Sequence, residues 1–190
     1  WEEGDNRIVD FDRMPDGEVR VLDGGLMRKR EKLWKAAGVV LPVFALRSEK
    51  SCGVGDFGDL RLLVDWAAAN DMRVIQLLPV NDTTMQHNWN DSYPYNTISV
   101  NALHPHYVNL DEAGRLANEG SMLDYNRRRS ELNNLPYTDY EAVAKVKTGY
   151  MRELYADIED KLRGDAEFIK FKKDNGDWLL PYATFCILRD

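Results

Sequence analysis

The sequence predicts an α/β fold that contains one parallel βαβ unit. Two short apolar runs, residues 38–46 and 72–80, have the near-continuous hydrophobicity of strands that are covered on both faces. Between them lie four apolar residues at the spacing of one helix face: Leu60, Leu63, Val64 and Ala67. A strand, a helix and a second strand in this order are typical of a parallel pair joined by a right-handed crossover.

The residues around this helix carry the expected terminal signals. The glycine-rich segment 53–58 is predicted to be a strand-to-helix turn, and either Asp56 or Asp59 can cap the first turn of the helix. Asn70 can end it. A phosphate-binding role for segment 53–58 is less favoured, because it lacks the Lys-Ser/Thr pair of a P-loop and a full dinucleotide fingerprint.

The chain before residue 38 is predicted to belong to other structural units. Residues 1–12 alternate in hydrophobicity after a Gly-Asp-Asn turn, as expected for the last strand of a unit that begins earlier. Residues 13–37 have the mixed glycine, proline and charge content of a linker, with a possible short hairpin. The predicted domains are therefore residues 1–12, 13–37 and 38–190.

Residues 126–176 are expected to form a helical insertion within the third of these units. Thr138-Asp-Tyr-Glu141 has the pattern of a capping box with Thr138 at the N-cap. An amphipathic stripe follows it as far as Gly164, which predicts one long helix. A second helix is predicted from about Asp165 to Lys173, before an Asn-Gly pair.

The last segment, residues 178–188, is apolar nearly all round. It is predicted to be a buried helix with Pro181 in its first turn. Trp34, which precedes the first strand, is expected to pack against neighbouring side chains. Four aromatic residues on helical stripes are also expected in the core: Trp66, Phe168, Trp178 and Phe185.

Composition and charge argue against several classes of function. The net charge of −7 argues against nucleic-acid binding, and the basic run 127–129 is expected to be a solvated helix end. No run approaches the ~18 apolar residues of a membrane span, so no membrane partner is expected. Cys52 and Cys186 belong to no metal motif, and reduced thiols in a cytoplasmic protein are expected.

The loop after the second strand has the composition of a sugar-binding surface. Sugars present hydroxyl edges and apolar ring faces, so their sites combine hydrogen-bonding groups with flat aromatic rings. The loop leaves the carboxyl end of a predicted parallel strand, where α/β proteins build their sites. Between residues 81 and 96 it contains Asn81, Asp82, Gln86, His87, Asn88, Trp89, Asn90, Asp91, Ser92, Tyr93, Tyr95 and Asn96.

Several of these residues allow more than one interpretation. Asp82 and Asp91 could be a catalytic carboxylate pair, but the favoured interpretation is that they cap and form turns in a surface loop. His104-Pro-His106 could coordinate a metal, yet no further ligands accompany it, and a rigid turn with one hydrogen-bonded imidazole is favoured. Composition alone leaves sugar contact and core packing about equally supported for three aromatic residues: Trp89, Tyr93 and Tyr95.

Six motifs follow one another along the chain, at residues 40–49, 53–58, 76–79, 91–99, 102–105 and 178–190. In this order they resemble 4-α-glucanotransferases of the amylomaltase type, in particular the branch of the cytosolic plant disproportionating enzyme and its bacterial relatives. The resemblance covers roughly residues 31–190 and depends on the order of the motifs, since each alone is weakly specific.

The resemblance implies a (β/α)₈ barrel. Because such a barrel takes ~250 residues, the chain is expected to form only part of one: the first βαβ unit, the long loop and the helical insertion. The nucleophile, acid/base and third carboxylate of the family are expected beyond Asp190, so no catalytic residue is assigned. The start at Trp1 and the end inside an apolar helix are likewise expected of a fragment.

The resemblance also assigns four substrate-binding residues. The family's Asp-Ser-Pro-Tyr loop corresponds to Asp91-Ser92-Tyr93-Pro94-Tyr95, with Tyr93 inserted. Tyr95 is expected to stack on the sugar ring beside the cleaved bond, while Ser92 and Asp91 belong to the pocket motif. Residues 1–7 resemble the last strand of a starch-binding module, so Trp1 is expected to stack on glucose.

The first functional hypothesis is therefore a retaining 4-α-glucanotransferase that acts on malto-oligosaccharides or a starch- or glycogen-type glucan, without a metal or other cofactor. The alternatives are a non-catalytic α-glucan-binding piece and a hydrolase of the wider α-amylase clan. The sequence leaves chain-length preference, natural acceptor and oligomeric state open.

Overall fold

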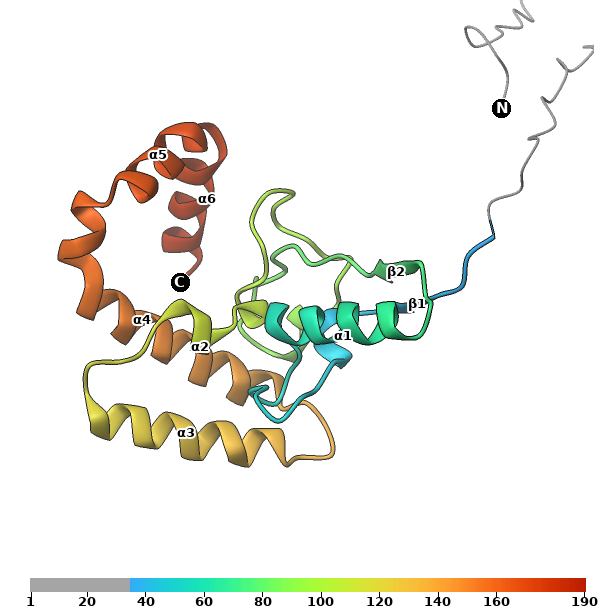
Figure 1. Cartoon of the computed structure of the whole chain (residues 1–190). Coiled ribbons are helices and arrows are strands. Elements are labelled where there is room, and N and C mark those ends of the chain that lie inside the picture. Colours follow the sequence, from blue (N-terminus) through green and yellow to red (C-terminus); the bar gives the residue numbers. More distant parts are fainter. Residues whose placement is uncertain (1–34) are drawn as a thin grey trace, which may run out of the picture. The chain divides into compact units, whose positions relative to one another are not determined.

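The computed structural model describes residues 35–190, which are mostly helical with a small parallel sheet (Figure 1). The predicted strand and linker within residues 1–34, together with Trp1 and Trp34, lie outside the described residues. No helix among residues 35–190 combines the length and apolarity needed to cross a membrane.

The predicted βαβ unit is confirmed, with shorter strands than expected. β1 (Gly38–Leu41) and β2 (Val74–Leu77) pair in parallel, with Gly38 opposite Val74 and Leu41 opposite Leu77. The run predicted to extend β1 to residue 46 instead turns at Pro42, which has no N–H to donate to a ladder, and continues as the 3₁₀ turn Val43–Ala45.

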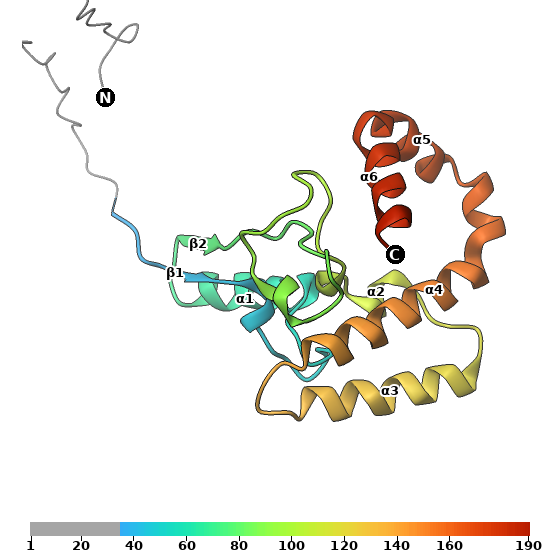
Figure 2. The ribbon, with the colours of Figure 1, turned by 180° about the vertical axis from the view of Figure 1, so that it is seen from behind.

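The sheet is also less covered than its apolar sequence predicted. Val40 and Val74 are exposed, so the expectation that the strands are buried on both faces is wrong for the described residues. Helix α1 (Phe57–Ala69) lies along the strands in both views (Figures 1 and 2). Among the described residues, two strands and one helix leave one face of the sheet exposed, whereas the other face is half-buried.

The predicted terminal signals of α1 are confirmed. The Asp56 carboxylate accepts hydrogen bonds from the N–H groups of Gly58 (2.8 Å) and Asp59 (3.3 Å). The Asp59 carboxylate in turn accepts from the Asp56 N–H at 3.0 Å, which completes a capping box. Asn70 is the C-cap residue. The two candidate caps therefore act together at one helix start.

Five helices make up the second half of the chain. The core lies where the turn at Cys52 and Val54 meets the first three of them, and α3 and α4 run side by side (Figure 2). The buried side chains there include Leu110, Tyr125 and Val143. The helices are α2 (Leu110–Ala113), α3 (Glu119–Asn133), α4 (Tyr140–Gly164), α5 (Ala166–Asp174) and α6 (Gly176–Arg189).

The long helix predicted up to Gly164 is confirmed as α4, but its predicted cap is wrong by one residue. Asp139 is the N-cap and accepts from the Ala142 N–H at 3.0 Å. The Thr138 hydroxyl instead donates to the Gly53 carbonyl at 3.2 Å. Both residues are good caps, and this tertiary contact draws Thr138 away from the helix start.

The second and third predicted helices are confirmed as α5 and α6, while the burial expected of α6 is wrong. α6 starts at Gly176, so Pro181 lies inside the helix and not in its first turn. Leu180, Ile187 and Leu188 are largely exposed. The apolar sequence of α6 predicts a surface that is buried against a partner, and no element of residues 35–190 packs against these three side chains.

Two other sequence expectations are corrected. Trp66 and Phe185 are exposed and Phe168 and Trp178 are only half-buried, so none of the four predicted core aromatics is a core residue here. The basic run 127–129 lies inside α3, not at a helix end. It is paired with Asp124, Glu131 and Asp111.

Candidate functional site

The loop that follows β2 is closed at its base by backbone pairing. Asn81 and Leu103 form an antiparallel bridge, the Asp82 N–H donates to the Ala102 carbonyl (2.9 Å), and the His104 N–H donates to the Val80 carbonyl (3.0 Å). The intervening segment contains the 3₁₀ turn Trp89–Ser92. The predicted sugar-binding residues between 81 and 96 therefore share one anchored loop at the carboxyl end of a parallel strand.

Two buried carboxylates hold this loop in shape. Asp91 accepts from the N–H groups of Gln86 (3.0 Å) and His87 (2.7 Å), while its backbone carbonyl accepts from the Thr83 hydroxyl. Asp82 accepts from the Thr84 N–H at 2.9 Å and, through its other oxygen, from the Tyr182 hydroxyl at 2.6 Å on α6.

The turn-forming role favoured for these two aspartates is confirmed, although both are buried and not at the surface. Because Asp91 binds loop backbone through its carboxylate, its part in a pocket is to set the loop conformation. A direct contact between Asp91 and a substrate stays a prediction.

The aromatic residues of the loop are free of the core. Trp89, Tyr93 and Tyr95 have exposed fractions of 69%, 57% and 58%, which decides against core packing within the described residues. The rings of Tyr93 and Tyr95 lie 5.5 Å apart between centroids and are tilted by 48°. Each ring therefore has surface available for a ligand face.

A cavity of about 260 Å³ lies against the inner side of the loop. It brings Ser92 together with the His104-Pro-His106 turn and the start of α4, whereas Tyr93 and Tyr95 lie outside it. Both aromatic rings and hydrogen-bonding groups line it, as expected of a small polar-ligand site. The lining residues are Phe44, Val54, Asn81, Thr83, Trp89, Ser92, Pro94, His104, His106, Tyr107, Thr138 and Tyr140.

The histidine turn forms one wall of this cavity, as the 3₁₀ turn Pro105–Tyr107. The Nδ1 atom of His104 accepts from the His106 N–H at 3.2 Å, and its Nε2 lies 2.9 Å from the Tyr140 hydroxyl. This confirms the rigid turn with one hydrogen-bonded imidazole. Among residues 35–190 no cluster of His, Cys, Asp and Glu could hold a metal ion.

Burial keeps the groups in this wall uncharged. It lowers the pKa of His104, and it lowers the pKa of His106 to about 2, helped by the nearby His104 and Lys147. Burial also raises the pKa of Tyr140. The wall therefore offers neutral donors and acceptors at ordinary pH, which suits a neutral ligand better than an ion.

Sequence reasoning missed Lys147, which anchors this wall from behind. Its side chain is only 1% exposed, and its Nζ donates to the carbonyls of His106 (2.6 Å) and Val108 (2.9 Å). Asp56 Oδ2 lies 3.7 Å away. The available signal was a lysine on the apolar stripe of α4, between the buried Val143 and Tyr150.

The paired charges of Lys147 and Asp56 do not fully offset their desolvation. Burial lowers the pKa of Lys147 and raises the pKa of Asp56, although each partner opposes the shift of the other. Both shifts move toward the neutral form, as expected where burial outweighs a pair held at 3.7 Å. The two carbonyls that Lys147 binds stabilise its ammonium group further.

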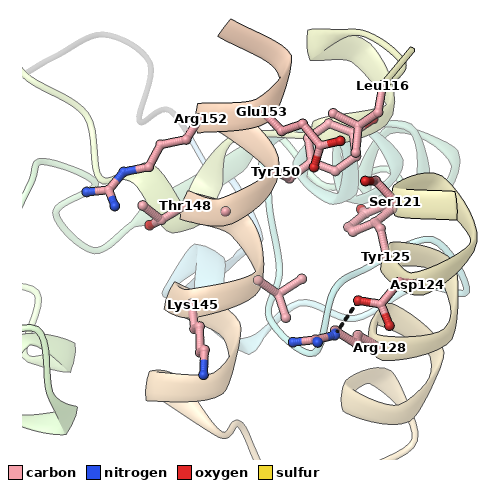
Figure 3. Close-up of a pocket in the computed structure, with 12 residues that line it drawn as sticks. Leu116, Ser121, Asp124, Tyr125, Arg128, Lys145, Thr148, Tyr150, Arg152 and Glu153 are labelled. Atoms are coloured by element: carbon pink, nitrogen blue, oxygen red, sulfur yellow. Dashed lines mark ion pairs between the residues drawn. The ribbon is translucent and has the colours of Figure 1, made fainter. Parts of the chain in front are cut away.

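A larger groove of about 470 Å³ between α3 and α4 is a weaker candidate (Figure 3). Three of its polar side chains are engaged within the protein: Arg128 pairs with Asp124 at 2.7 Å, and the Tyr150 hydroxyl donates to the Gly114 carbonyl at 2.6 Å. Thr148 and Arg152 point away from α3. We therefore place the candidate site in the smaller cavity and the exposed face of its loop.

The comparisons with known proteins agree with the family that the motifs resemble. The family model described as 4-alpha-glucanotransferase matches residues 41–190. The chain is 41% identical to 4-alpha-glucanotransferase DPE2 of Oryza sativa subsp. japonica over 190 residues, which cover 98% of the chain and 20% of that protein. It is 34% identical over 149 residues to a 4-alpha-glucanotransferase of Chlamydia pneumoniae, with 78% and 27% covered.

A 4-alpha-glucanotransferase of Synechocystis sp. is 29% identical over 163 residues, with 82% of the chain and 30% of that protein covered. The chain thus spans between a fifth and three tenths of the length of these relatives. Because the family model matches 150 consecutive residues of 190, far more than a single shared motif, the chain belongs to the 4-alpha-glucanotransferase family.

Proposed function

We propose that the whole protein containing this chain transfers α-1,4-glucosyl or glucan units from maltose or malto-oligosaccharides to a sugar acceptor, with retention of configuration. The observation that carries the proposal is the loop of residues 81–103. It combines the family motif with exposed aromatic rings and a neutral polar cavity at the carboxyl end of β2.

Within that function, this chain provides binding surface rather than reactive carboxyls. Retaining glycosyl transfer needs two carboxyl groups about 5–5.5 Å apart, one as nucleophile and one as acid/base. Asp82 and Asp91 are both buried and bound to their own loop, so neither is placed to attack a sugar. The reactive groups are proposed to come from a different part of the protein.

Transfer requires that a sugar acceptor replace water at the glycosyl-enzyme intermediate. Tyr95 is proposed to stack on the ring beside the cleaved bond, and Ser92 to line the pocket next to it. A sugar held on these groups both occupies the place of water and is oriented for attack. The exposure of Tyr95 supports this role, because a ring sealed in the core could not stack.

The architecture proposed for the whole protein follows from family membership. β1, α1 and β2 are proposed to be the first βαβ unit of a (β/α)₈ barrel, and α3 to α5 an insertion on it. The predicted starch-binding role of Trp1 and a cytoplasmic location are part of the same proposal. The free thiols of Cys52 and Cys186 are compatible with a reducing compartment.

Incubation of the whole protein with maltotriose tests the proposed function. Longer oligosaccharides together with glucose are the expected products. Shorter sugars alone would identify a hydrolase, and unchanged maltotriose that still binds would identify a glucan-binding protein. Residues 1–190 expressed alone serve as the control and are expected to show no turnover, because they lack the reactive pair.

A further inference from the structure

The imidazole of His106 is a buried polar group without a partner. The residue is only 5% exposed, and its backbone N–H and carbonyl are bound to His104 and Lys147. Its ring makes no hydrogen bond within residues 35–190, in contrast to the ring of His104, whose two nitrogens are both engaged. The ring nitrogens of His106 are therefore free to hydrogen-bond to a ligand or to water.

His106 lines the cavity, and its ring nitrogens are not sealed from solvent. Among residues 35–190, every side-chain nitrogen or oxygen that is sealed from solvent has a hydrogen-bond partner. Because the ring nitrogens of His106 have no such partner, they are not sealed, and a ligand can reach them. His106 lines the cavity beside Ser92 and also a second one, of about 440 Å³, that reaches α6. Its ring is held between Tyr140 (4.3 Å between centroids) and His104 (4.6 Å).

The surroundings of the ring define the chemistry it can bind. Lys147 holds its positive charge against the His106 carbonyl, which disfavours a second positive charge on the ring and selects against a cation. A neutral imidazole has one donor and one acceptor. A sugar hydroxyl also donates and accepts, and the aromatic rings of Trp89 and Tyr140 line the same cavity.

We propose that His106 is a substrate-binding residue that hydrogen-bonds one hydroxyl of a glucose unit held in the cavity beside Ser92. This inference rests on the proposed function and deepens it, because it names the group that recognises the sugar there. Neither the Asp-Ser-Pro-Tyr motif nor the loop of residues 81–96 contains this residue.

The test compares His106→Leu with His106→Gln in the whole protein. His106→Leu removes both hydrogen-bonding atoms, and we expect KM for maltotriose to rise about 2- to 10-fold with a smaller change in kcat. His106→Gln restores a neutral donor and acceptor and is expected to return KM to within about twofold of the unsubstituted protein. Lys161→Leu, at the exposed end of α4, is the control for an added leucine.

A panel of monodeoxy maltose analogues identifies the hydroxyl. One analogue is expected to bind the unsubstituted protein more weakly than maltose does, while His106→Leu no longer distinguishes the two. If both proteins respond alike to every analogue, only water completes the ring and the inference is wrong. A protein that neither binds nor converts glucans would overturn the proposed function as well, whereas an active protein with an unaffected His106→Leu variant overturns this inference alone.

Discussion

At the scale of single residues, the loop after β2 separates side chains that hold it from side chains that face outward. Asp91 and Asp82 bind loop backbone and are buried, whereas Trp89 and Tyr95 are more than half exposed. The buried carboxylates restrict the loop to one shape, which reduces the conformational entropy that a ligand would otherwise have to overcome. The exposed rings supply the contact area.

Tyr95→Ala is expected to lower the rate of glucan transfer by the whole protein about 2- to 12-fold, because a stacking interaction of about 0.5–1.5 kcal/mol is lost. Rates of maltotriose disproportionation measure this. Tyr155→Ala, which removes an exposed tyrosine of α4, is the matched control and should leave the rate unchanged. Equal rates for Tyr95→Ala and the unsubstituted protein would show that Tyr95 makes no productive sugar contact.

The buried histidines predict a loss of stability on mild acidification. The folded-state pKa of His106 is lowered from 6.5 to about 2, and that of His104 is lowered too, so only the unfolded chain gains these protons near pH 6. Stability is therefore nearly complete above pH 6.5 and falls below it. The loss due to His106 is about 1.4 kcal/mol at one pH unit below, and His104 adds to it in the same direction.

Urea unfolding of the protein at pH 7.5, 6.5 and 5.5 measures this loss. The His106→Gln variant should lose less stability over the same range, since its side chain does not titrate. A free energy of unfolding that is the same at pH 7.5 and 5.5 would contradict the neutral state of the histidine wall.

At the scale of elements, helix ends are set by local chemistry that tertiary contacts can redirect. Asp56 and Asp59 act as sequence patterns predict, because both groups needed for the capping box lie within one turn. At the start of α4 the predicted box fails, since the Thr138 hydroxyl is bound to Gly53 and Asp139 takes the cap.

Asp139→Ala should destabilise α4 by about 1 kcal/mol, the usual cost of a lost N-cap. Asp139→Asn keeps a capping oxygen and should retain most of that stability. The free energies of unfolding of both variants provide the measurement. If Asp139→Ala left the free energy of unfolding unchanged, Thr138 and not Asp139 would be the N-cap residue of α4.

The helices differ in how clearly the sequence predicts them. α1 and α4 have apolar stripes at helical spacing and were predicted, while α3 was not predicted as an element of its own. Its buried side chains are only Tyr125 and Leu132, seven residues apart, and the rest of its surface is polar. Two buried positions in 15 residues are too few to give a recognisable helical periodicity of apolar residues, so the sequence did not predict this helix.

At the scale of the whole molecule, Lys147 joins three separated segments. It links α4 to the histidine turn and to the start of α1 through the carbonyls of His106 and Val108 and the Asp56 carboxylate. The cavity wall, the sheet-to-helix turn and the helical core are therefore held by one buried ammonium group.

Lys147→Met is expected to destabilise the protein by about 3–5 kcal/mol, because it leaves Asp56 and two carbonyls buried without their partner. Lys145→Met, the same change on the exposed face of α4, should stay within about 0.5 kcal/mol of the unsubstituted protein. Unfolding free energies decide between the two outcomes, and equal values for both variants would show that the buried pair contributes no net stability.

The sequence by itself determined the order β1–α1–β2, the long helix α4, the loop of polar and aromatic residues, and the family. These features depend on spacing between near neighbours in the chain, and on motifs that stay recognisable without coordinates. The parallel pairing also followed, because a strand-helix-strand order allows few other arrangements.

Only the tertiary structure decided which side chains are buried and what they bind. It placed Lys147 in the core, left Trp66 and the apolar face of α6 exposed, and separated Ser92 in the cavity from Tyr95 outside it. Periodicity shows that a face is apolar but not which element covers it. Burial and hydrogen bonding depend on partners that lie far away in the sequence, so they appear only when those partners are brought together in space.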